Sequence, residues 1–402
     1  MLTPLPLPGG TTLAAVESLM VALGRLLDGV EPRAIFPHPP EATPEPDTAP
    51  AAGPGVVIAT SGSTTGSGQL VDLSPQALVA SAHATYERLA GPGQWVACLP
   101  VHHIAGLQVL VRSHVGGTRP VVVDTTTGFD AERLASAVNE LSPRTPGYLS
   151  VVPTQLARLL AAGPAVFAPL RGLAAILVGG AATAPRLLAD AREAGLPVVT
   201  TYGMTETGGG CVYDGRPLDD VAARVDEEGR VWLGGPTLAR GYLGDPAATA
   251  ASFVTHRGRT WLRTNDRGRW DGDRLVVLGR LDDVIISGGS NVPAGEVARV
   301  IAELGVADVV VVGVSDAEWG QLVTAVIAGP APPLAEIRAH VRAELGAHCA
   351  PRALVRVERL PLRGLGKPDR QAAAALASRA LESDAALEPA RSGVLGVERR
   401  GH

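Results

Sequence analysis

The chain has 402 residues, of which 46% are hydrophobic and 19% are charged, enough length and apolar content for two or three domains. Its formal net charge is −5, and no block of Lys or Arg stands out, which excludes nucleic acid and anionic membrane surfaces as expected partners. The three cysteines are widely separated, no signal peptide is evident and no apolar run is long enough to span a membrane, so we expect a cytoplasmic protein.

The first elements in chain order are a helix and a connector. Residues 11–30 carry apolar side chains at helical spacing, and residues 37–55 are rich in Pro, Ala and Glu, which is typical of an exposed connector. From residue 56 to about residue 211, short β-rich runs alternate with helix-like segments. The expected strands are 55–60, 95–100, 119–124, 174–180 and 196–203, and the expected helices are 75–90, 129–141, 153–162 and 184–194. This alternation predicts a parallel sheet covered by helices.

After residue 211 the pattern changes to strands and turns, and beyond Arg280 a smaller α+β unit follows. In that unit we expect strands at 306–314 and 322–329 and a helix at 334–347. The predicted fold class is therefore α/β, with a large N-terminal domain of mixed sheets packed with helices and a small C-terminal α+β domain. The expected limits are 1–280 and 281–378, and the charged, Ala-rich segment 379–402 is predicted to be a flexible tail.

Two polar motifs follow expected strands. "VVIATSGSTTGSGQLVDLS", residues 56–74, contains a loop dense in Ser, Thr and Gly, whose backbone N–H and hydroxyl groups suit phosphate oxygens, although a polar linker would look similar. It is not a Walker A motif, because no Gly-Lys-[Ser/Thr] is present. "TTYGMTETGGG", residues 200–210, offers the flat ring of Tyr202 together with the hydroxyl of Thr205 and the carboxylate of Glu206. These oxygen groups suit phosphate and Mg²⁺, although an ordinary turn with a capped helix start remains the alternative.

Two further motifs lie in the second half of the chain. Residues 263–297 contain Asp266, whose two carboxylate oxygens could accept hydrogen bonds from the vicinal hydroxyls of a ribose, although exposed Asp residues usually mark solvated turns. The segment "LRGLGKPDR", residues 362–370, holds Lys367, the only lysine among 35 cationic residues. A slim ammonium group can enter a narrow site that the planar fork of Arg cannot, but an Arg-rich composition could also leave one lysine by chance.

Together and in this order, these blocks resemble the acyl-adenylate-forming superfamily, which includes acyl- and aryl-CoA ligases, adenylation domains and luciferases. The resemblance covers the Ser/Thr/Gly loop at 60–69, "YGMTET" at 202–207, the Asp266 block, "GRLDDVIISGGSNVPAGE" at 279–296 and "GLGKPDR" at 364–370. It implies a large N-terminal domain and a small, mobile C-terminal domain. It also implies a small carboxylic acid, ATP, Mg²⁺ and coenzyme A as the molecules bound, and leaves a homodimer open.

The resemblance also implies a role for individual residues. Lys367 would bridge the acid and the α-phosphate as the adenylate forms, where a positioned cation in a dry cleft stabilises developing charge. Thr205 would hold phosphate, Glu206 would hold Mg²⁺, and the small domain would turn about a hinge at Asp282. The residues expected to bind the nucleotide or coenzyme A are Thr60, Ser61, Gly62, Ser63, Thr64, Thr65, Gly66, Gly179, Gly180, Ala181, Tyr202, Gly203, Asp266, Arg280, Gly288 and Gly289.

This sequence departs from the family pattern in two places. Phosphate loops of the family usually carry Pro-Lys near their end, whereas the positions here are Gly68 and Gln69, and the loop has one extra Thr. Because the loop lacks its own cation, we expect slower adenylation or looser ATP binding. Members of the family also usually have well over a hundred residues before this loop, which here starts at Thr60, so we expect a compact form without part of the N-terminal subdomain.

The segments at 98–113 and 148–160, "CLPVHHIAGLQVLVRS" and "YLSVVPTQLARLL", resemble the o-succinylbenzoate–CoA ligases of menaquinone biosynthesis. The expected function is therefore ATP-dependent formation of o-succinylbenzoyl-CoA with release of pyrophosphate and AMP. The acid has a second carboxylate, and His103, Arg112 and Thr154 are candidates for recognising it, because a buried anion needs charge-assisted partners. Ordinary alternatives are a surface ion pair for Arg112 and a hydrogen-bonded core histidine for His103.

Two other functions stay open. One is the same chemistry on a different acid, by another aryl- or acyl-CoA ligase or by a stand-alone adenylating enzyme that loads a carrier protein. The other is a non-catalytic relative that only binds nucleotide.

Overall fold

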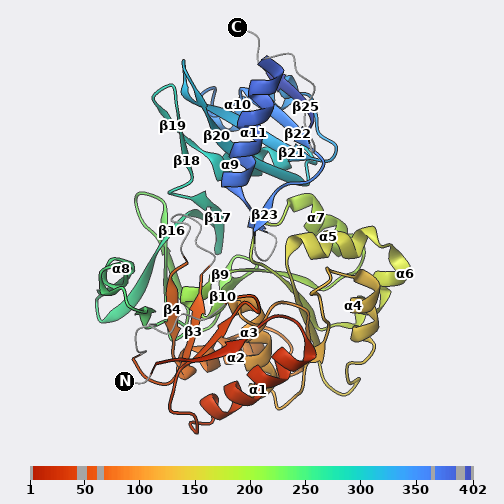
Figure 1. Cartoon of the computed structure of the whole chain (residues 1–402), viewed down its shortest axis with the longest axis vertical. Coiled ribbons are helices and arrows are strands. Elements are labelled where there is room, and N and C mark those ends of the chain that lie inside the picture. The colour runs from red at the N-terminus through yellow and green to blue at the C-terminus, as the bar shows by residue number, and fades with distance from the viewer. Residues whose placement is uncertain (1–2, 43–51, 61–67, 364–366, 386–393, 400–402) are drawn as a thin grey trace.

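The structure is a computed structural model that describes residues 3–42, 52–60, 68–363, 367–385 and 394–399. For residues 363, 367 and 383–385 it describes the backbone alone. Figure 1 shows a large lobe, built by the chain up to strand β17, and a small lobe that begins at strand β18. Among the described helices, none combines the length and the hydropathy that crossing a membrane would require.

The centre of the large lobe is a sheet whose strands follow the order β11-β10-β9-β8-β7-β5-β6. Strands β5 to β9 are mutually parallel, which confirms the expectation from the strand–helix alternation, and β10 runs antiparallel to β9. The strands are β5 (Gln94–Ala97), β6 (Val121–Val122), β7 (Gly147–Val151), β8 (Ala175–Val178), β9 (Val198–Met204), β10 (Gly209–Tyr213) and β11 (Arg216–Pro217). The helices of this part are α2 (Pro75–Arg88), α3 (Ile104–Val115), α4 (Ala131–Val138), α5 (Pro153–Ala161), α6 (Pro164–Phe167) and α7 (Pro185–Glu193).

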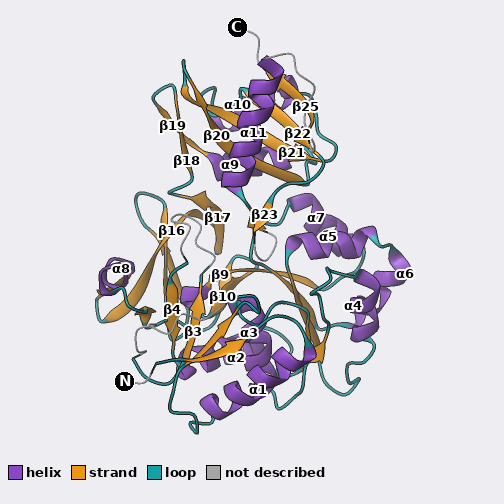
Figure 2. Cartoon of the chain, viewed as in Figure 1, coloured by secondary structure: helices purple, strands orange, loops and turns teal. Residues whose placement is uncertain are grey.

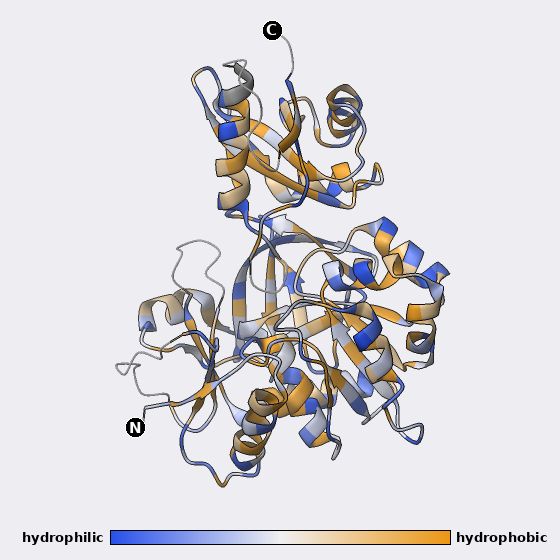
Figure 3. Ribbon diagram, turned by 45° about the vertical axis from the view of Figure 1, so that its right-hand side comes forward, coloured by the Kyte–Doolittle hydropathy of each residue, from blue (hydrophilic) through white to orange (hydrophobic). Residues whose placement is uncertain are grey.

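These helices begin where the sequence carries helix-start signals. Ser74 caps α2, with its hydroxyl accepting from the backbone N–H of Ala77 at 3.0 Å, and Pro75 occupies the first turn. Asp130 caps α4 in the same way. Figure 2 shows the helices packed around the strands, and Figure 3 shows the apolar residues concentrated on the inner elements of each lobe. Burial of these apolar faces is the main force that holds the layers together.

Two smaller sheets complete the large lobe. The first has the order β1-β2-β3-β4-β14 and packs with helix α1 (Leu13–Leu27), whose buried side chains include Val16, Leu19 and Leu23. Its strands are β1 (Leu5–Pro8), β2 (Ile35–His38), β3 (Val56–Ala59), β4 (Leu70–Leu73) and β14 (Gly241–Tyr242). The second has the order β12-β13-β16-β15, with β17 paired to β16, and lies beside helix α8 (Pro246–Ser252). Its strands are β12 (Ala222–Val225), β13 (Arg230–Gly234), β15 (Phe253–His256), β16 (Arg259–Asp271) and β17 (Arg274–Arg280).

The small lobe is a sheet with helices on both faces. Alternate residues of strand β20 (Asp308–Asp316) enter different cores: Val311 packs with helices α9 and α10, whereas Val310 and Val312 pack with helix α11. The other strands are β18 (Val284–Ser287), β19 (Ser290–Pro293), β21 (Gly320–Ala328), β22 (Ala353–Val357) and β25 (Val394–Arg399). The helices are α9 (Ala294–Ala302), α10 (Leu334–Leu345) and α11 (Arg370–Ala385), and a short ribbon is formed by β23 (Leu362–Arg363) and β24 (Lys367–Pro368).

The predicted flexible tail differs from the structure over its described residues. Helix α11 continues past residue 379 to Ala385, and β25 pairs antiparallel with β22. The helix packs through Ala373, Ala377 and Ala380, which are buried and recur at helical spacing, so an Ala-rich segment here forms a close-packed face. Alanine gives little hydropathy contrast along the sequence, which is why this face was not evident from composition.

Candidate active site

Some of the predicted nucleotide residues and one predicted acid residue lie at or near the carboxyl ends of three adjacent parallel strands. Strand β7 leads to Thr154 in the first turn of α5, β8 leads to Gly179 and Gly180, and β9 contains Tyr202. Because parallel strands end on the same edge of a sheet, these segments meet there, which is where open α/β sheets bind ligands. A Cβ atom at Gly179 would lie 2.2 Å from the hydroxyl of Thr201, so the close approach of these two strands requires glycine.

Strand β9 continues into a tight turn that carries the predicted phosphate and metal residues. Thr205 and Glu206 begin a short 3-10 helix, Thr205–Thr207. The hydroxyl of Thr207 accepts from the backbone N–H of Met204 at 2.9 Å and donates to the carbonyl of Gly209 at 2.7 Å. The fully buried Thr207 therefore closes the turn from inside, and orders the two residues before it.

The same turn is anchored to the helices beneath it. Gly208 ends the turn in the left-handed conformation, with φ of 61°, and its carbonyl accepts from the amide of Gln108 at 2.7 Å and from the hydroxyl of Ser81 at 3.1 Å. Gln108 and Ser81 are buried side chains of α3 and α2. Sequence reasoning missed both, because they are distant in the chain from the motif that they support.

Glu206 is the one carboxylate of this turn. Its Oε1 accepts from the hydroxyl of Tyr242 at 3.0 Å, and its backbone carbonyl accepts from the N–H of Ala239 at 2.8 Å. Burial, followed by the neighbouring Glu206 carboxylate, raises the pKa of Tyr242, which keeps the phenol protonated as a donor. Among the described residues no cluster of three or more metal-ligating side chains occurs. A single carboxylate with substrate phosphates is nevertheless a usual way for proteins to hold Mg²⁺, so Glu206 fits the predicted ion.

Asp266 and Tyr202 are joined by a hydrogen bond of 2.6 Å, from the tyrosine hydroxyl to Oδ2 of the carboxylate. The structure thus brings together the second and third motifs, which are far apart in the sequence. Asp266 is 9% exposed, and its register partner across β17 is Arg280. Burial first, and the Asp266 charge second, raise the pKa of Tyr202 well above its usual value, so Tyr202 remains a neutral donor to the carboxylate.

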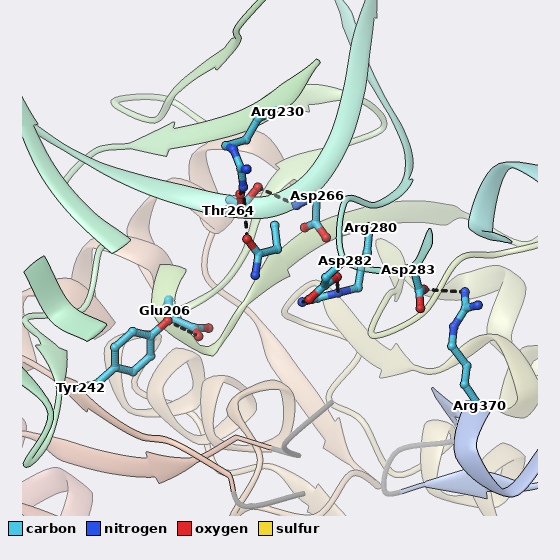
Figure 4. Close-up of polar contacts among 10 residues, drawn as sticks. Glu206, Arg230, Tyr242, Thr264, Asp266, Arg280, Asp282, Asp283 and Arg370 are labelled. Carbon is cyan, nitrogen blue, oxygen red and sulfur yellow. Dashed lines mark hydrogen bonds and ion pairs between the residues drawn. The ribbon is translucent and has the colours of Figure 1, made fainter. Parts of the chain in front are cut away.

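The segment that links the lobes carries two ion pairs. Arg280 donates from Nε and Nη2 to the two oxygens of Asp282, at 2.7 and 2.6 Å, and Asp283 pairs with Nη2 of Arg370 at 2.7 Å (Figure 4). Burial opposes ionisation of Asp282, but the hydrogen bond from Arg280, the charge of Arg280 and smaller favourable contributions together outweigh it, and the pKa of Asp282 is lowered. Burial raises the pKa of Asp283. Asp282, the predicted hinge residue, is therefore bonded directly to Arg280, the predicted support for the ribose.

The predicted phosphate loop lies mostly outside the described residues, including Ser61, Gly62, Ser63, Thr64, Thr65 and Gly66. The residues at the two ends of the loop, Thr60 on one side and Gly68 and Gln69 on the other, are described and adjoin the antiparallel strands β3 and β4. Thr60 donates from its backbone N–H to the carbonyl of Gln69 at 2.8 Å, and the N–H of Gln69 donates to the Thr60 hydroxyl at 2.9 Å. A Cβ atom at Gly68 would lie 1.9 Å from the Thr60 carbonyl oxygen, so this departure from the family pattern also serves a tight closure of the loop.

The Lys367 side chain also lies outside the described part of the structure. Its backbone is described, and pairs in β24 with Arg363 of β23. Figure 1 shows this ribbon below the small lobe, on the side that faces the large lobe.

The glycines predicted to border coenzyme A form the tip of the β18–β19 hairpin. Gly288 and Gly289 both have positive φ, 56° and 74°, a geometry that suits the right-handed twist of a two-residue hairpin loop. The N–H of Gly288 donates to the carbonyl of Trp319 at 2.9 Å, and a Cβ atom at Gly288 would lie 2.7 Å from the Trp319 ring. Trp319, which sequence reasoning did not identify, therefore fixes the position of this tip.

The three residues predicted to recognise the acid lie on two helices. His103 is the N-cap of α3, and its ring centre lies 4.4 Å from that of His102. Arg112 lies on the same helix but is 3% exposed; its guanidinium lies 4.9 Å from the centre of the Trp95 ring and donates to the Tyr213 hydroxyl at 3.3 Å. The surface ion pair considered for Arg112 is therefore absent among the described residues. Its Nε atom is buried without a protein partner in that part of the chain.

The chain is similar to known proteins over most of its length. The family model for AMP-binding enzymes matches residues 12–243, and the model for the C-terminal domain of AMP-binding enzymes matches residues 298–367. A Mycobacterium tuberculosis protein named probable 2-succinylbenzoate–CoA ligase is 44% identical over 330 residues, which cover 79% of this chain and 83% of that protein.

Two solved structures are also similar. One is o-succinylbenzoate CoA synthetase from Bacillus subtilis in complex with its acyl-adenylate intermediate, with a TM-score of 0.66 and 27% identity, covering 84% of this chain and 69% of that chain. The other is a variant of Escherichia coli MenE with bound OSB-AMS, with a TM-score of 0.71 and 26% identity, covering 94% of this chain and 88% of that chain. With both family models matched in order, and with Tyr202 of one family motif bonded to Asp266 of another, this chain belongs to the family of AMP-binding enzymes.

Proposed function

We propose that this chain is an AMP-forming 2-succinylbenzoate–CoA ligase (2-succinylbenzoate is o-succinylbenzoate) and that it acts in menaquinone biosynthesis. The observation that carries the proposal is the 44% identity over 330 residues with the mycobacterial protein of that name. The geometry supports it, because Tyr202 of β9 donates to Asp266 and Glu206 lies in the turn that follows the same strand.

In the first half-reaction the acid carboxylate attacks the α-phosphorus of ATP, pyrophosphate leaves, and an acyl-adenylate forms. Asp266 would accept hydrogen bonds from the ribose hydroxyls, with Arg280 beside it, and Tyr202 with the segment Gly179–Ala181 would border the adenine. Thr205 and the loop after Thr60 would donate to phosphate oxygens. Mg²⁺ held at Glu206 would neutralise charge on the phosphates.

In the second half-reaction the thiol of coenzyme A attacks the acyl carbonyl carbon and AMP leaves. Lys367 would act only in the first half-reaction, by placing its ammonium group between the acid and the α-phosphate. For the second, the small domain would turn about Asp282 and bring the tip at Gly288 and Gly289 to the site. A tip without side chains would let the pantetheine arm pass close to the backbone.

The second carboxylate of the acid needs a cationic or hydrogen-bonding partner inside the protein. Arg112 supplies a buried guanidinium whose Nε has no protein partner among the described residues, so it is the strongest of the three candidates. A buried donor without a partner costs about 1–3 kcal/mol, and an anionic ligand would recover that cost. His103 and Thr154 stay candidates by their places at the starts of α3 and α5.

A coupled assay tests the proposal. Purified protein is given ATP, Mg²⁺ and coenzyme A with 2-succinylbenzoate, benzoate or a fatty acid, and both pyrophosphate and thioester are measured. We expect thioester only with 2-succinylbenzoate. Thioester with another acid would assign a different CoA ligase, pyrophosphate without thioester would indicate an enzyme that loads a different acceptor, and neither product with any acid would contradict the proposal. The cytoplasmic location and the homodimer stay predictions.

A further inference from the structure

Tyr242 is not part of the motifs that identify the site, yet it contacts the predicted metal ligand. It lies in β14, which pairs with β4 in the first sheet of the large lobe, whereas Glu206 follows β9 of the central sheet. The hydrogen bond of 3.0 Å from its hydroxyl to Oε1 of Glu206 therefore joins two separate sheets. In Figure 4 the ring approaches Glu206 from the side opposite to Asp266 and Arg280.

The Tyr242 ring is itself held in place. It makes an edge contact with Phe253, with ring centres 5.8 Å apart, and its backbone N–H donates to the Thr249 hydroxyl at 2.9 Å. The preceding residue, Gly241, has φ of 147°, and a Cβ atom there would lie 2.4 Å from a Thr249 methyl carbon. The hydroxyl is thus presented to Glu206 by a rigid support on α8 and β15.

The segment before Tyr242 also forms a hydrogen bond with the backbone of Glu206. The N–H of Ala239 donates to the Glu206 carbonyl at 2.8 Å, so both the main chain and the carboxylate of Glu206 are bonded to residues 239–242. A carboxylate has about four lone-pair sites, so accepting from the tyrosine does not prevent it from also binding a cation. Partners of this kind orient a metal ligand, and their loss typically costs about 10–100-fold in metal affinity.

We propose that Tyr242 is a positioning residue for this reaction: its hydroxyl fixes the rotation of the Glu206 carboxylate so that Glu206 can bind the Mg²⁺ of ATP. The proposal rests on the role of Glu206 in the proposed function. Tyr242 does not touch the reacting atoms, and its effect is confined to the step that uses ATP.

The test replaces Tyr242 by Phe, which removes the hydroxyl and keeps the ring against Phe253. ATP binding is measured by calorimetry at a series of Mg²⁺ concentrations. We expect the half-saturating Mg²⁺ concentration to rise about 10-fold, with ATP affinity restored at high Mg²⁺. Thioester formation from supplied acyl-adenylate and coenzyme A, without ATP, is expected to keep the wild-type rate.

The matched control is Tyr148→Phe, which removes a tyrosine hydroxyl that donates to the Gly91 carbonyl at 2.7 Å rather than to Glu206, and it should leave the Mg²⁺ midpoint unchanged. In a Glu206→Ala background, Tyr242→Phe should add no further shift. An unchanged midpoint in Tyr242→Phe, or equal shifts in Tyr242→Phe and Tyr148→Phe, would overturn the proposal. These binding measurements need no acid. They therefore test the role of Tyr242 even if the wild-type protein makes no thioester from 2-succinylbenzoate, so the failure of one proposal can be told from the failure of the other.

Discussion

Arg267 of the large lobe forms an ion pair with Glu296 of the small lobe, with Nη1 and Oε1 3.0 Å apart. Arg267 lies on β16, close to Asp266, and Glu296 lies in the first turn of α9. Beside the pair, the backbones of Gly279 and Gly295 touch, so that a Cβ atom on Gly279 would lie 3.2 Å from the Gly295 Cα. Together the two contacts connect the edge of the large lobe that carries Asp266 to the helix that follows the β18–β19 hairpin.

The Arg267–Glu296 pair is expected to favour this arrangement of the lobes modestly. The Arg267 side chain is 45% exposed, so the pair contributes about 0.5 kcal/mol, or roughly a twofold change in population. Because the ribbon that carries Lys367 faces the large lobe in this arrangement (Figure 1), Arg267→Ala should slow adenylate formation about twofold relative to thioester formation from supplied acyl-adenylate. The control is Arg269→Ala on the same strand, whose partner Asp271 lies 3.9 Å away within the large lobe. Equal effects of the two variants on the ratio of rates would contradict this role.

The contact between the backbones of Gly279 and Gly295 predicts that a methyl group added at Gly295 lowers the adenylation rate more than the loss of the Arg267–Glu296 ion pair does. Gly295 lies in the first turn of α9, where Ala is the better helix former by about 1 kcal/mol, so Gly295→Ala should not destabilise the small lobe itself. Its Cβ would lie 3.1 Å from the Gly279 Cα, so the two backbones at this contact would have to separate by a few tenths of an ångström. We expect the melting temperature to be maintained while the adenylation rate falls several-fold.

The control for this variant is Gly396→Ala in β25, where a Cβ atom meets nothing within 4 Å. It should leave both half-reactions unchanged. A Gly295→Ala protein with wild-type adenylation would show that the lobes do not need this close approach.

Asp266→Asn should weaken ATP binding through the ribose. A hydrogen bond to a charged acceptor contributes about 1.5–3 kcal/mol, so we expect the KM for ATP to rise at least about 10-fold. The sharper readout is 3′-deoxy-ATP: the wild type should lose affinity for it, whereas the variant should hardly distinguish it from ATP. Asp271→Asn, an exposed position on the same strand, is the control. If the Asp266→Asn protein still bound ATP in preference to 3′-deoxy-ATP as strongly as the wild type, Asp266 would not be part of the ribose site.

Lys367→Ala should reduce pyrophosphate release by about 10²–10³-fold, the usual effect of losing one preorganised group that stabilises the transition state. Thioester formation from supplied acyl-adenylate should remain, because the proposed role is confined to the first half-reaction. Lys367→Arg keeps the charge but not the shape, and we expect it to restore little activity. Parallel losses in both half-reactions would argue that Lys367 has another role.

The interactions of Glu398 predict that the stability gained by attaching β25 to the small lobe depends on pH. Its carboxylate accepts from the Leu334 N–H at 2.8 Å and pairs with Arg356 at 3.0 Å, and these interactions, the first being the larger, lower its pKa. A carboxylate whose pKa is lowered by folding stabilises the fold above its unfolded pKa, and this stabilisation is lost as pH falls through its folded pKa. Glu398→Gln should therefore cost about 0.5 kcal/mol at pH 7 and nothing at an acidic pH below both pKa values. Urea unfolding at the two pH values measures the difference, with exposed Glu358→Gln as the control. A loss that persists at low pH would point to packing.

The order of strands and helices in the large lobe could be predicted from the sequence, because hydrophobic period and turn residues are local signals. The expected helix at 75–90 begins at its Ser-Pro cap and ends as α2 at Arg88, and the expected strand at 174–180 contains β8. The tail could not be predicted in this way, since the alanines of α11 signal their burial only when β20 lies against them.

Residue chemistry in short motifs was enough to identify Tyr202, Glu206, Asp266 and Lys367 as candidates and to expect ATP and an acid as substrates. Tertiary structure alone decided the partners: Tyr202 donates to Asp266, Tyr242 to Glu206, and Arg267 reaches Glu296 across the lobes. The physical reason is that a motif reports which groups a short segment can offer, whereas these bonds depend on the pairing of strands far apart in the chain. That pairing is set by the burial of whole sheets, which no short segment encodes.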